Sequence, residues 1–450
     1  MSANSPNPYE NRIERILDKV TTANAEADLI VNQQQSLSLK ANQGELEEYK
    51  VSSTQIFGLR VIKEGKVGIA YSEASDDDSL TSMVDQALLN ASFSATEPHE
   101  SLLKNELNLS TDDALLCPKD DSTIDEKIAL VLELESGLLA RPKIKNVPYN
   151  GLQDSISQQS IYSTAGLKAQ SKHRSTSAYA YALAEEGDKN AMEGVGRLQR
   201  VFQQLDSQEI IDEAYENCMA MLEGKPIASK HYDVIFDKEC QTDLFSSFAI
   251  MFSGKSAKDG INPWREKVGE VVADERLQLF DNPLNTDGFG YELFDSEGTA
   301  TSKTPLIDKG QLQTLLHNSV TANHFGVETT GHASRGPKST LNVHQHQLEI
   351  AAGSDQLAAL QIGEYVEITK LDGLHAGVNA ISGDFSLGAA GYLCREGERV
   401  QAIRGIVVAG NFYQMLKEQV ACIGDTQYWN WQKSSLMPSL RFSDLAISGA

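Results

Sequence analysis

The sequence contains few cysteines, and none of them are paired at short spacing. Its five cysteines are scattered, with no Cys-x-x-Cys pattern: Cys117, Cys218, Cys240, Cys394 and Cys422. This pattern is typical of reduced thiols in a packed interior, and it argues against a disulfide framework. The chain also has no apolar run near the ~20 residues that cross a bilayer, and residues 1–8 lack a signal-peptide core. We therefore expect a cytoplasmic protein with no membrane segment.

Positive charge is also scarce. The chain has 39 Lys and Arg against 63 Asp and Glu, which gives a formal net charge of −24. Such a surface repels phosphate backbones at ordinary salt, so the composition predicts no direct nucleic-acid partner. With 450 residues, the chain is long enough for two or three domains that each bury a core.

Motifs for nucleotide, calcium and serine chemistry are missing. Gly254-Lys255-Ser256 resembles the end of a P-loop, but Ala249 stands where that motif requires glycine. The acidic run at residues 76–78 is not followed by an EF-hand pattern, and we interpret it as the start of a helix. No G-x-S-x-G nucleophile elbow is present, and residues 382–388 are expected to form a tight glycine turn.

The usual helix of a zinc hydrolase is absent as well. The single His-Glu pair is His99-Glu100, and no second histidine follows it at ligand spacing. His344 and His346 lie on one face of an expected strand, yet no third ligand is close in sequence. An independent metallopeptidase would have to gather distant side chains, for example these two histidines and Cys422.

The first part of the chain predicts an α+β unit of about residues 1–95. Apolar residues at helical spacing indicate a helix over residues 9–22, and extended pieces follow. Lys63-Glu64-Gly65-Lys66 is typical of a hairpin turn within this antiparallel meander. A second helix is expected over residues 80–91, with its N-terminus in the acidic run.

A similar unit is expected over about residues 122–225, after a polar connection. It contains a helix over residues 124–140, extended pieces as far as residue 184, and a final helix that includes Ile210 and Leu222. Because both units end in strand, turn, strand and helix, they suggest a weak duplication.

The main domain boundary is predicted at Gly224-Lys225-Pro226, where glycine and proline interrupt the pattern. Beyond it the chain is rich in glycine and β-prone residues, with helices near residues 312–325 and 411–420. The predicted fold class is therefore α+β, with an N-terminal α+β domain of two similar units (1–225) and a β-rich C-terminal domain (226–450).

One apolar segment, residues 242–254, is predicted to be a buried helix within the C-terminal domain. Its apolar positions have helical spacing: Leu244, Phe245, Phe248, Met251 and Phe252. Thr242 or Asp243 is expected to cap the N-terminus, and Gly254 to end the helix. No side chain in this helix can take a proton from water or hold a metal through an imidazole.

Three stretches together resemble the PmbA/TldD family, and specifically its PmbA (TldE) branch. The first is Phe294-Asp295-Ser296-Glu297-Gly298-Thr299 with residues 304–310, and the second is Thr330-Gly331-His332-Ala333-Ser334-Arg335-Gly336. The third runs from Ser382-Gly383-Asp384-Phe385-Ser386 through residues 391–393 to residues 404–411. Their order and spacing carry the resemblance, which covers essentially the whole chain.

The resemblance implies a cytoplasmic metalloprotease system in which a TldD-like and a PmbA-like subunit pair, mature ribosomally made peptides and degrade unfolded polypeptides. The family is also described as a modulator of DNA gyrase. TldD-like chains carry an HExxxH helix with two zinc ligands and the base. On this sequence, Ser246 and Ser247 match the His-Glu and Met251 matches the second histidine. His332 also replaces an expected asparagine.

These substitutions imply a subunit without catalytic or zinc-binding residues, and zinc is expected in the TldD-like partner instead. The expected partners are that subunit and an extended or unfolded peptide, with a homodimer as an alternative when the partner is missing. Two other hypotheses remain: an independent metallopeptidase with an unrecognised site, and a non-enzymatic adaptor that regulates DNA gyrase.

Overall fold

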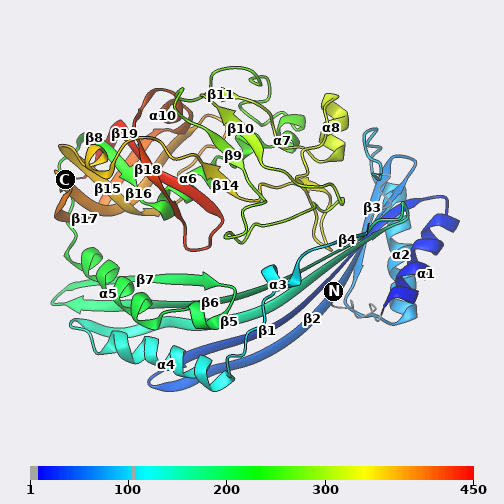
Figure 1. Ribbon diagram of the computed structural model, residues 1–450, viewed down its shortest axis with the longest axis horizontal. Helices are drawn as coiled ribbons and strands as arrows, with labels where there is room; N and C mark the ends of the chain where they lie inside the picture. The colour runs from blue at the N-terminus through cyan, green and yellow to red at the C-terminus, as the bar shows by residue number, and fades with distance from the viewer. Residues whose placement is uncertain (1–8, 104–107, 450) are drawn as a thin grey trace.

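A long, curved sheet occupies the first half of the chain in the computed structural model, which describes residues 9–103 and 108–449 (Figure 1). The strand order is β3-β2-β1-β5-β6-β4, and β7 also pairs with β6. The strands are β1 (Glu26–Asn42), β2 (Glu45–Lys63), β3 (Lys66–Ser72), β4 (Asn108–Ser110), β5 (Ile144–Ser163), β6 (Lys168–Glu186) and β7 (Lys189–Gln199). Because β1 pairs with β5, both predicted units contribute to one sheet.

The extended pieces predicted from the sequence merge into long strands. Polar residues in the middle of β1 and β2 interrupt the apolar pattern, but the two strands stay paired from Glu26 opposite Ile62 to Asn42 opposite Glu45. The predicted hairpin turn is confirmed between β2 and β3, where Glu64 and Gly65 have φ of 55° and 71°. Positive φ at both central residues matches the right-handed twist of the strands.

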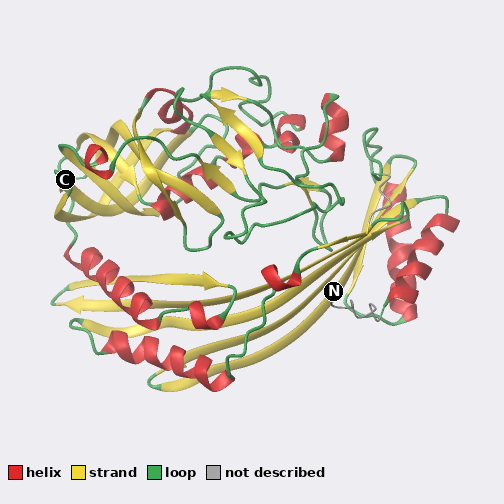
Figure 2. Cartoon of the chain, viewed as in Figure 1, coloured by secondary structure: helices red, strands yellow, loops and turns green. Residues whose placement is uncertain are grey.

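Helices cover the two ends of this sheet and leave its middle open (Figure 2). Helices α1 (Glu10–Thr22) and α2 (Asp77–Phe93) pack at one end, and α4 (Ile124–Leu139) and α5 (Ser207–Glu223) at the other. The short α3 (Asp113–Leu116) and η1 (Phe202–Gln204) lie in connections. The predicted start of α2 is confirmed, since the Asp76 carboxylate accepts from the Ser79 N–H at 2.9 Å.

The second half of the chain is rich in strands and builds its own core. The strands are β8 (Lys230–Phe236), β9 (Leu279–Asp281), β10 (Thr304–Asp308), β11 (Gln311–Leu312), β12 (Ala333–Ser334), β13 (Asn342–Val343), β14 (Leu348–Ile350), β15 (Glu364–Asp372), β16 (Asp384–Arg395), β17 (Glu398–Asn411), β18 (Val420–Trp429) and β19 (Ser435–Ser448). Strand β8 pairs with both β15 and β19, so the strands β8, β15, β16, β17 and β19 close into a ring. The predicted fold class, α+β followed by a β-rich region, is confirmed.

The helices of this half are short, and one is shorter than predicted. They are α6 (Lys238–Ser247), η2 (Ala249–Phe252), α7 (Gly254–Lys258), α8 (Ser319–Phe325), α9 (Leu357–Leu360) and α10 (Phe412–Glu418). Leu312 belongs to β11, so the prediction of a helix over residues 312–325 was wrong in its first half. Asn318 caps α8 by accepting from the Thr321 N–H at 2.9 Å, which sets its start.

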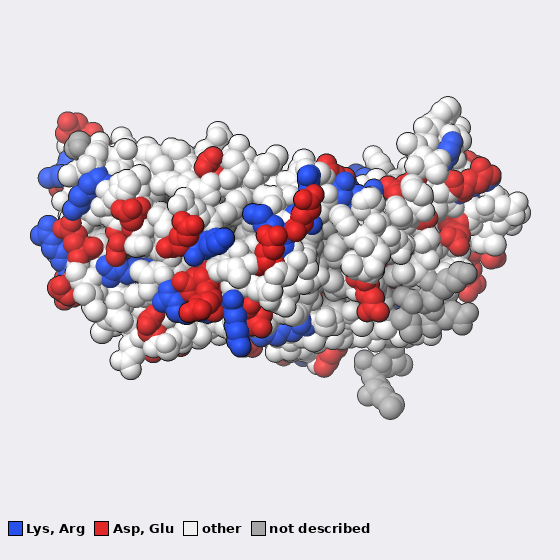
Figure 3. Space-filling model, turned by 90° about the horizontal axis from the view of Figure 1, so that it is seen from above, with Lys and Arg blue, Asp and Glu red and all other residues white. Residues whose placement is uncertain are grey.

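Charged side chains of both signs are interspersed on the face seen from above (Figure 3). Within the described ranges, no helix has the length and apolar character needed to cross a membrane.

Candidate functional site

The central apolar segment begins earlier than predicted. Asp237 precedes α6, and its carboxylate accepts from the Cys240 N–H at 2.8 Å, so it is the N-cap. Thr242 and Asp243 therefore lie inside the helix, and the prediction that one of them caps it was wrong. The Thr242 hydroxyl instead donates to the Lys238 carbonyl at 2.8 Å, a bond that a side chain makes within a helix.

The segment is also interrupted, so the prediction of one continuous helix over residues 242–254 was wrong. Phe248, at φ −105° and ψ 11°, ends α6, and the 3₁₀ turn η2 follows. Ser253 then caps α7 by accepting from the Ser256 N–H at 3.1 Å, so Gly254 opens a helix instead of ending one. The local cap at Ser253 competes with continuation of the earlier helix.

The three positions that match the family's zinc helix do not converge. Ser246 is exposed, and the Ser247 hydroxyl donates to the Asp243 carbonyl at 2.8 Å. Met251 lies in η2 and is fully buried in the core of the C-terminal half. The interruption at Phe248 thus separates two hydroxyls near the surface from a thioether in the interior.

Aromatic packing holds this segment in place. The Phe248 ring stacks on Phe412 of α10, with ring centroids 4.5 Å apart and an interplanar angle of 5°, and Phe245 meets the same ring edge-on at 5.1 Å. Asn411, at the end of the third family stretch, caps α10 by accepting from the Gln414 N–H at 3.1 Å. That stretch therefore supports the central segment through α10.

His332 is part of a buried hydrogen-bonded chain. Its Nε2 lies 2.5 Å from the Asp281 carboxylate and its Nδ1 lies 2.8 Å from the Thr330 hydroxyl. The Asp281 carboxylate also accepts from the main-chain N–H groups of His346 at 3.0 Å and Gln347 at 2.7 Å. In the place of the expected asparagine, the imidazole joins β9 to the loop before β12.

His346 lies beside His332 and is also engaged at both ring nitrogens. Its Nδ1 is 3.1 Å from the Glu292 carboxylate, and its Nε2 is 3.0 Å from the Gly331 carbonyl. Burial alone would lower the pKa of His346, but the carboxylates of Glu292 and Asp281 outweigh it and raise the pKa to about 9. A protonated imidazole can donate to both acceptors at once, as this geometry requires.

Asp281, His332 and His346 are the one group of three potential metal ligands found within residues 9–103 and 108–449, with donor atoms within 4.8 Å of one another. The hypothetical set of His344, His346 and Cys422 is not brought together, because Cys422 lies on β18 beside the Ala359 carbonyl. A metal bound at the observed group would have to displace hydrogen bonds at both imidazoles.

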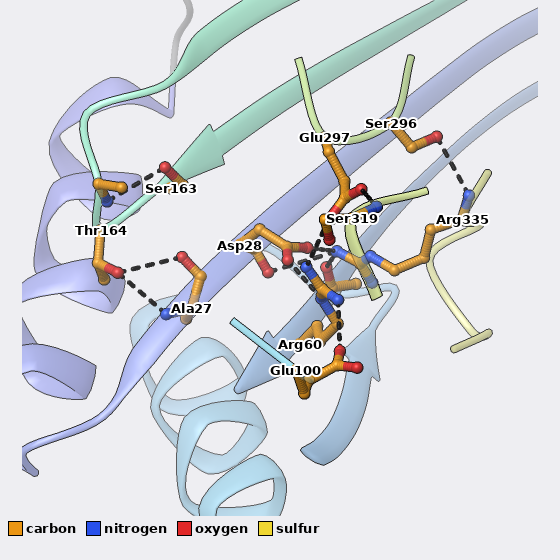
Figure 4. Close-up of polar contacts among 12 residues, drawn as sticks. Ala27, Asp28, Arg60, Glu100, Ser163, Thr164, Ser296, Glu297, Ser319 and Arg335 are labelled. Carbon is orange, nitrogen blue, oxygen red and sulfur yellow. Dashed lines mark hydrogen bonds and ion pairs between the residues drawn. The ribbon is translucent and has the colours of Figure 1, made fainter. Parts of the chain in front are cut away.

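A buried ion network joins the two halves of the chain (Figure 4). The Arg60 guanidinium on β2 contacts Asp28 on β1 at 2.5 Å, Glu100 at 2.6 Å and Glu297 at 3.9 Å. From the other half, Arg335 donates to the Asp28 carboxylate. Burial would lower the pKa of Arg60, but the surrounding carboxylates outweigh it and raise it.

The first two family stretches supply the C-terminal side of this network. The Asp295 carboxylate accepts from the N–H groups of Glu297, Thr299 and Ala333, each at 2.9 Å, and so ties the two stretches together. Burial and the neighbouring Glu297 charge raise the pKa of Asp295 to about 7. These stretches therefore form a joint between the two halves, with their charged side chains inside it.

A cavity of about 950 Å³ lies between the two halves, next to the first turn of α6. Its walls come from β6, β7 and α5 on one side, and from α6, β15, β16 and β17 on the other. Asp237, Glu239 and Asp243 of the central segment face it. Burial raises the pKa of Asp237 to about 6 and that of Glu239 to about 7. The cavity thus places the carboxylates at the start of the central segment against β6, β7 and α5 of the other half.

Sequence analysis missed the ion network and the cavity. The available signal for the network was an ionisable residue inside an apolar strand pattern, Asp28 before Leu29 and Arg60 between Leu59 and Val61. Such residues are rarely buried without partners. The cavity left no comparable signal, because its lining residues are separated widely in sequence.

Three family models match consecutive parts of the chain. They are the PmbA/TldA metallopeptidase domain 1 over residues 27–91, the central domain over residues 117–222 and the C-terminal domain over residues 229–449. Together they cover most of the sequence.

Curated relatives and solved structures agree with these matches. The Haemophilus influenzae metalloprotease PmbA homolog is 24% identical, covering 92% of this chain and 90% of the relative. Metalloprotease PmbA of Escherichia coli O157:H7 is 23% identical, covering 93% and 92%. TldE from Thermococcus kodakarensis superposes with a TM-score of 0.85 at 20% identity, covering 97% of this chain and all of that one. A Thermotoga maritima protein named as a candidate modulator of a DNA gyrase gives a TM-score of 0.84 at 24% identity, with 98% and 100% covered.

Proposed function

This chain belongs to the PmbA/TldD metallopeptidase family, and on that premise we propose that it is the non-catalytic, PmbA/TldE-like subunit of a cytoplasmic peptide-hydrolysing pair. The observation that carries the proposal is the central segment. Ser246 is exposed and Met251 is buried, on two sides of the break at Phe248. These positions offer no imidazole and no converging donors, so they cannot hold zinc or activate water.

In this proposal the TldD-like subunit supplies zinc, and this chain supplies a second wall of the space in which a peptide is held. The substrate is an extended or unfolded peptide, because unpaired strand edges bind such segments through their main chain. This role needs no catalytic side chain from this subunit. The net charge of −24 disfavours direct contact with nucleic acid, so an effect on DNA gyrase would pass through protein contacts.

A second candidate function is an independent metallopeptidase, and the group of Asp281, His332 and His346 is the observation that favours it. Two imidazoles and a carboxylate are a known type of metal-ligand set. Against it, both nitrogens of each imidazole already have partners. We therefore favour the subunit role over an independent metallopeptidase.

Co-expression with the TldD-like chain of the same genome tests the proposed function. The two chains are expected to elute together in size-exclusion chromatography, and the mixed complex should cleave an unstructured peptide while this chain alone does not. Chelation of the complex should abolish cleavage. Metal-dependent cleavage by this chain alone, lost in His332→Ala, would instead support the second candidate. If the chains do not associate, and cleavage by the TldD-like chain is unaffected by this one, the subunit role is wrong.

A further inference from the structure

The cavity between the two halves surrounds the outer edge of β7. In the described residues, β7 pairs with β6 alone in the sheet. Ala178, Ala180 and Ala182 of β6 pack in the core that includes α5, so Tyr179 and Tyr181 point to the opposite face of the sheet. Both tyrosines line the cavity, and so do residues of α5. The cavity therefore contacts both faces of the sheet, and it can do so only by passing around the outer edge of β7. Residues 193–196 of β7 also line the cavity.

The cavity is strongly acidic. Nine carboxylates line it but only three cations, Lys238, Lys370 and Arg399. The carboxylates are Glu193, Glu209, Asp212, Glu213, Glu216, Asp237, Glu239, Asp243 and Glu367. Two of the three cations are already used, because Lys370 pairs with Glu193 and Arg399 holds Glu367 through two bonds of 2.8 and 2.9 Å.

Four of these carboxylates have no cation within ion-pair distance in the described part of the chain: Glu216, Asp237, Glu239 and Asp243. The Asp237 carboxylate accepts from the Cys240 N–H at 2.8 Å and also hydrogen-bonds with the Cys240 thiol, and Glu239 accepts from the Trp431 N–H at 2.8 Å. Asp237 is the N-cap of α6, and Glu239 and Asp243 lie in its first two turns, on the side of the cavity opposite β7. A cation entering here would meet several carboxylates and little competing positive charge.

We propose that this cavity binds an extended segment of a basic peptide, with its main chain along the free edge of β7 and its Lys or Arg side chains against the carboxylates at the start of α6. The proposal rests on the proposed function and specifies the class of substrate. The edge supplies main-chain hydrogen bonds, which do not depend on sequence. The opposing carboxylates supply the selection by charge, because a cationic side chain is attracted there and an acidic one is repelled.

Two further observations fit this arrangement. The volume of about 950 Å³ is at the upper end of the range of about 300–1,000 Å³ that ligand pockets occupy. Burial raises the pKa values of Glu193, Asp237, Glu239 and Asp243, which means that the surroundings of these carboxylates disfavour their charged forms. A bound cation would compensate Asp237, Glu239 and Asp243, which have no cation partner among the described residues, whereas Glu193 already pairs with Lys370.

Fluorescence polarisation with the purified full chain tests the proposal. The probe is a fluorescein-labelled heptapeptide of alternating Lys and Val. Two comparison peptides have the same length: alternating Glu and Val, and the Lys/Val sequence with alternate peptide nitrogens methylated. We expect the Lys/Val probe to bind at least about tenfold more tightly than either, because one comparison reverses the charge and the other blocks strand pairing. Spermidine, which has amines but no peptide backbone, should compete poorly.

A matched pair of variants locates the site. Glu239→Gln with Asp243→Asn removes two cavity charges, and the glutamine retains an oxygen that can accept from the Trp431 N–H. Glu14→Gln with Asp18→Asn removes two charges from the exposed face of α1. The cavity variant should bind the Lys/Val probe about three- to tenfold more weakly, and the α1 variant within about twofold of the parent.

Equal binding of the methylated and unmethylated probes would overturn the proposal, since attraction to an acidic protein would then suffice. Equal effects of the two variants would overturn it as well. These outcomes are separate from those of the co-expression experiment. A complex that forms and cleaves peptides while the cavity variant behaves like the α1 variant would contradict this inference alone. Cavity binding without association of the two chains would contradict the subunit role alone.

Discussion

Arg335 lies in the loop after β12, and an N–H group of its guanidinium donates a hydrogen bond to the carboxylate of Asp28. Asp28 lies 307 positions earlier in the chain, on β1. The same nitrogen reaches the Gly58 carbonyl on β2 at 3.2 Å. Close approach of the chains makes this contact possible, because a Cβ at Gly58 would lie 2.2 Å from the main chain of Pro337. The second family stretch is therefore fixed against the curved sheet by charge and by shape.

Loss of one member of this network should destabilise the whole chain. Arg335→Met keeps much of the side-chain volume but leaves Asp28 with less positive charge in a buried site. Removing one partner of a buried ion pair costs about 3–5 kcal/mol, so urea denaturation should show a loss of that order. Lys338→Met provides the control, because its pair with Glu73 at 3.2 Å is exposed and should change stability by less than about 1 kcal/mol. Similar midpoints for both variants would show that the network contributes little.

The stack of Phe248 on Phe412 gives a second prediction. Phe248→Ala should cost about 3–5 kcal/mol in unfolding free energy, because it opens a cavity in a fully buried core. Phe248→Asp should prevent stable folding, because it places an unpaired charge in that core. In the double variant with Phe412→Ala the effects should be less than additive, since the two rings contact each other. Thermal denaturation followed by circular dichroism measures each variant, and strict additivity would contradict a direct contribution from the stack.

The acidic start of α6 predicts a pH-dependent stability. Burial, aided by the charge of Asp237, raises the pKa of Glu239 to about 7, although the Trp431 N–H acts in the opposite direction. Since the pKa is higher in the folded than in the unfolded chain, ionised Glu239 destabilises the fold above about pH 7. That penalty is relieved as the pH falls towards the unfolded pKa of about 4.5.

Glu239→Gln should therefore be more stable than the parent at pH 8, by about 1–2 kcal/mol once partial solvent screening is allowed for. The two proteins should approach each other as the pH falls to about 4.5, where the carboxyl is protonated in the folded state and half protonated in the unfolded state. Melting temperatures between pH 4.5 and 8.5 provide the measurement. A constant difference across that range would mean that packing, and not ionisation, causes the effect.

Local sequence patterns were sufficient for the helices α1, α2, α4 and α5 and for the turn between β2 and β3. The acidic run before Leu80 and the Glu64-Gly65 pair specify a helix cap and a hairpin through neighbouring residues alone. The break at Phe248 could not be predicted in the same way, because its apolar neighbours have the spacing of a continuous helix. At the break, Phe248 stacks on the Phe412 ring, which the chain supplies 164 residues later.

The group of potential metal ligands could not be predicted from the sequence. Asp281, His332 and His346 come from three separate segments, so their spacing in sequence carries no ligand pattern. Sequence analysis placed His344 and His346 together on a strand, but both lie in the loop between β13 and β14, so that expectation was wrong. It also grouped them with Cys422, which lies on β18. The long-range pairing of strands decides which of these residues meet, and a single sequence gives little information about that pairing.

Metal content tests the proposal that this chain has no zinc site. The purified chain should contain no stoichiometric zinc, because Ser246, Ser247 and Met251 provide no imidazole or carboxylate ligand. The imidazoles of His332 and His346 are already hydrogen-bonded at both nitrogens. Elemental analysis after mild chelation gives the measurement. If about one zinc per chain is retained and is lost in His346→Ala, the prediction is wrong and the zinc is bound by the group of Asp281, His332 and His346.

The final prediction concerns the two serines that match the His-Glu of the family's zinc helix. Ser246→Ala with Ser247→Ala removes one exposed hydroxyl and one that donates within α6 to the Asp243 carbonyl. Alanine suits a helix at least as well as serine, so the double variant should fold and should still pair with the TldD-like chain. Neither hydroxyl is assigned a role in hydrolysis, and peptide cleavage by the mixed complex should therefore stay within about twofold of the parent. Cleavage is measured on the co-purified complex, with size-exclusion chromatography of the same sample as the control for pairing. A folded, paired double variant that no longer cleaves peptide would show that this segment takes part in catalysis, and the non-catalytic assignment would be wrong.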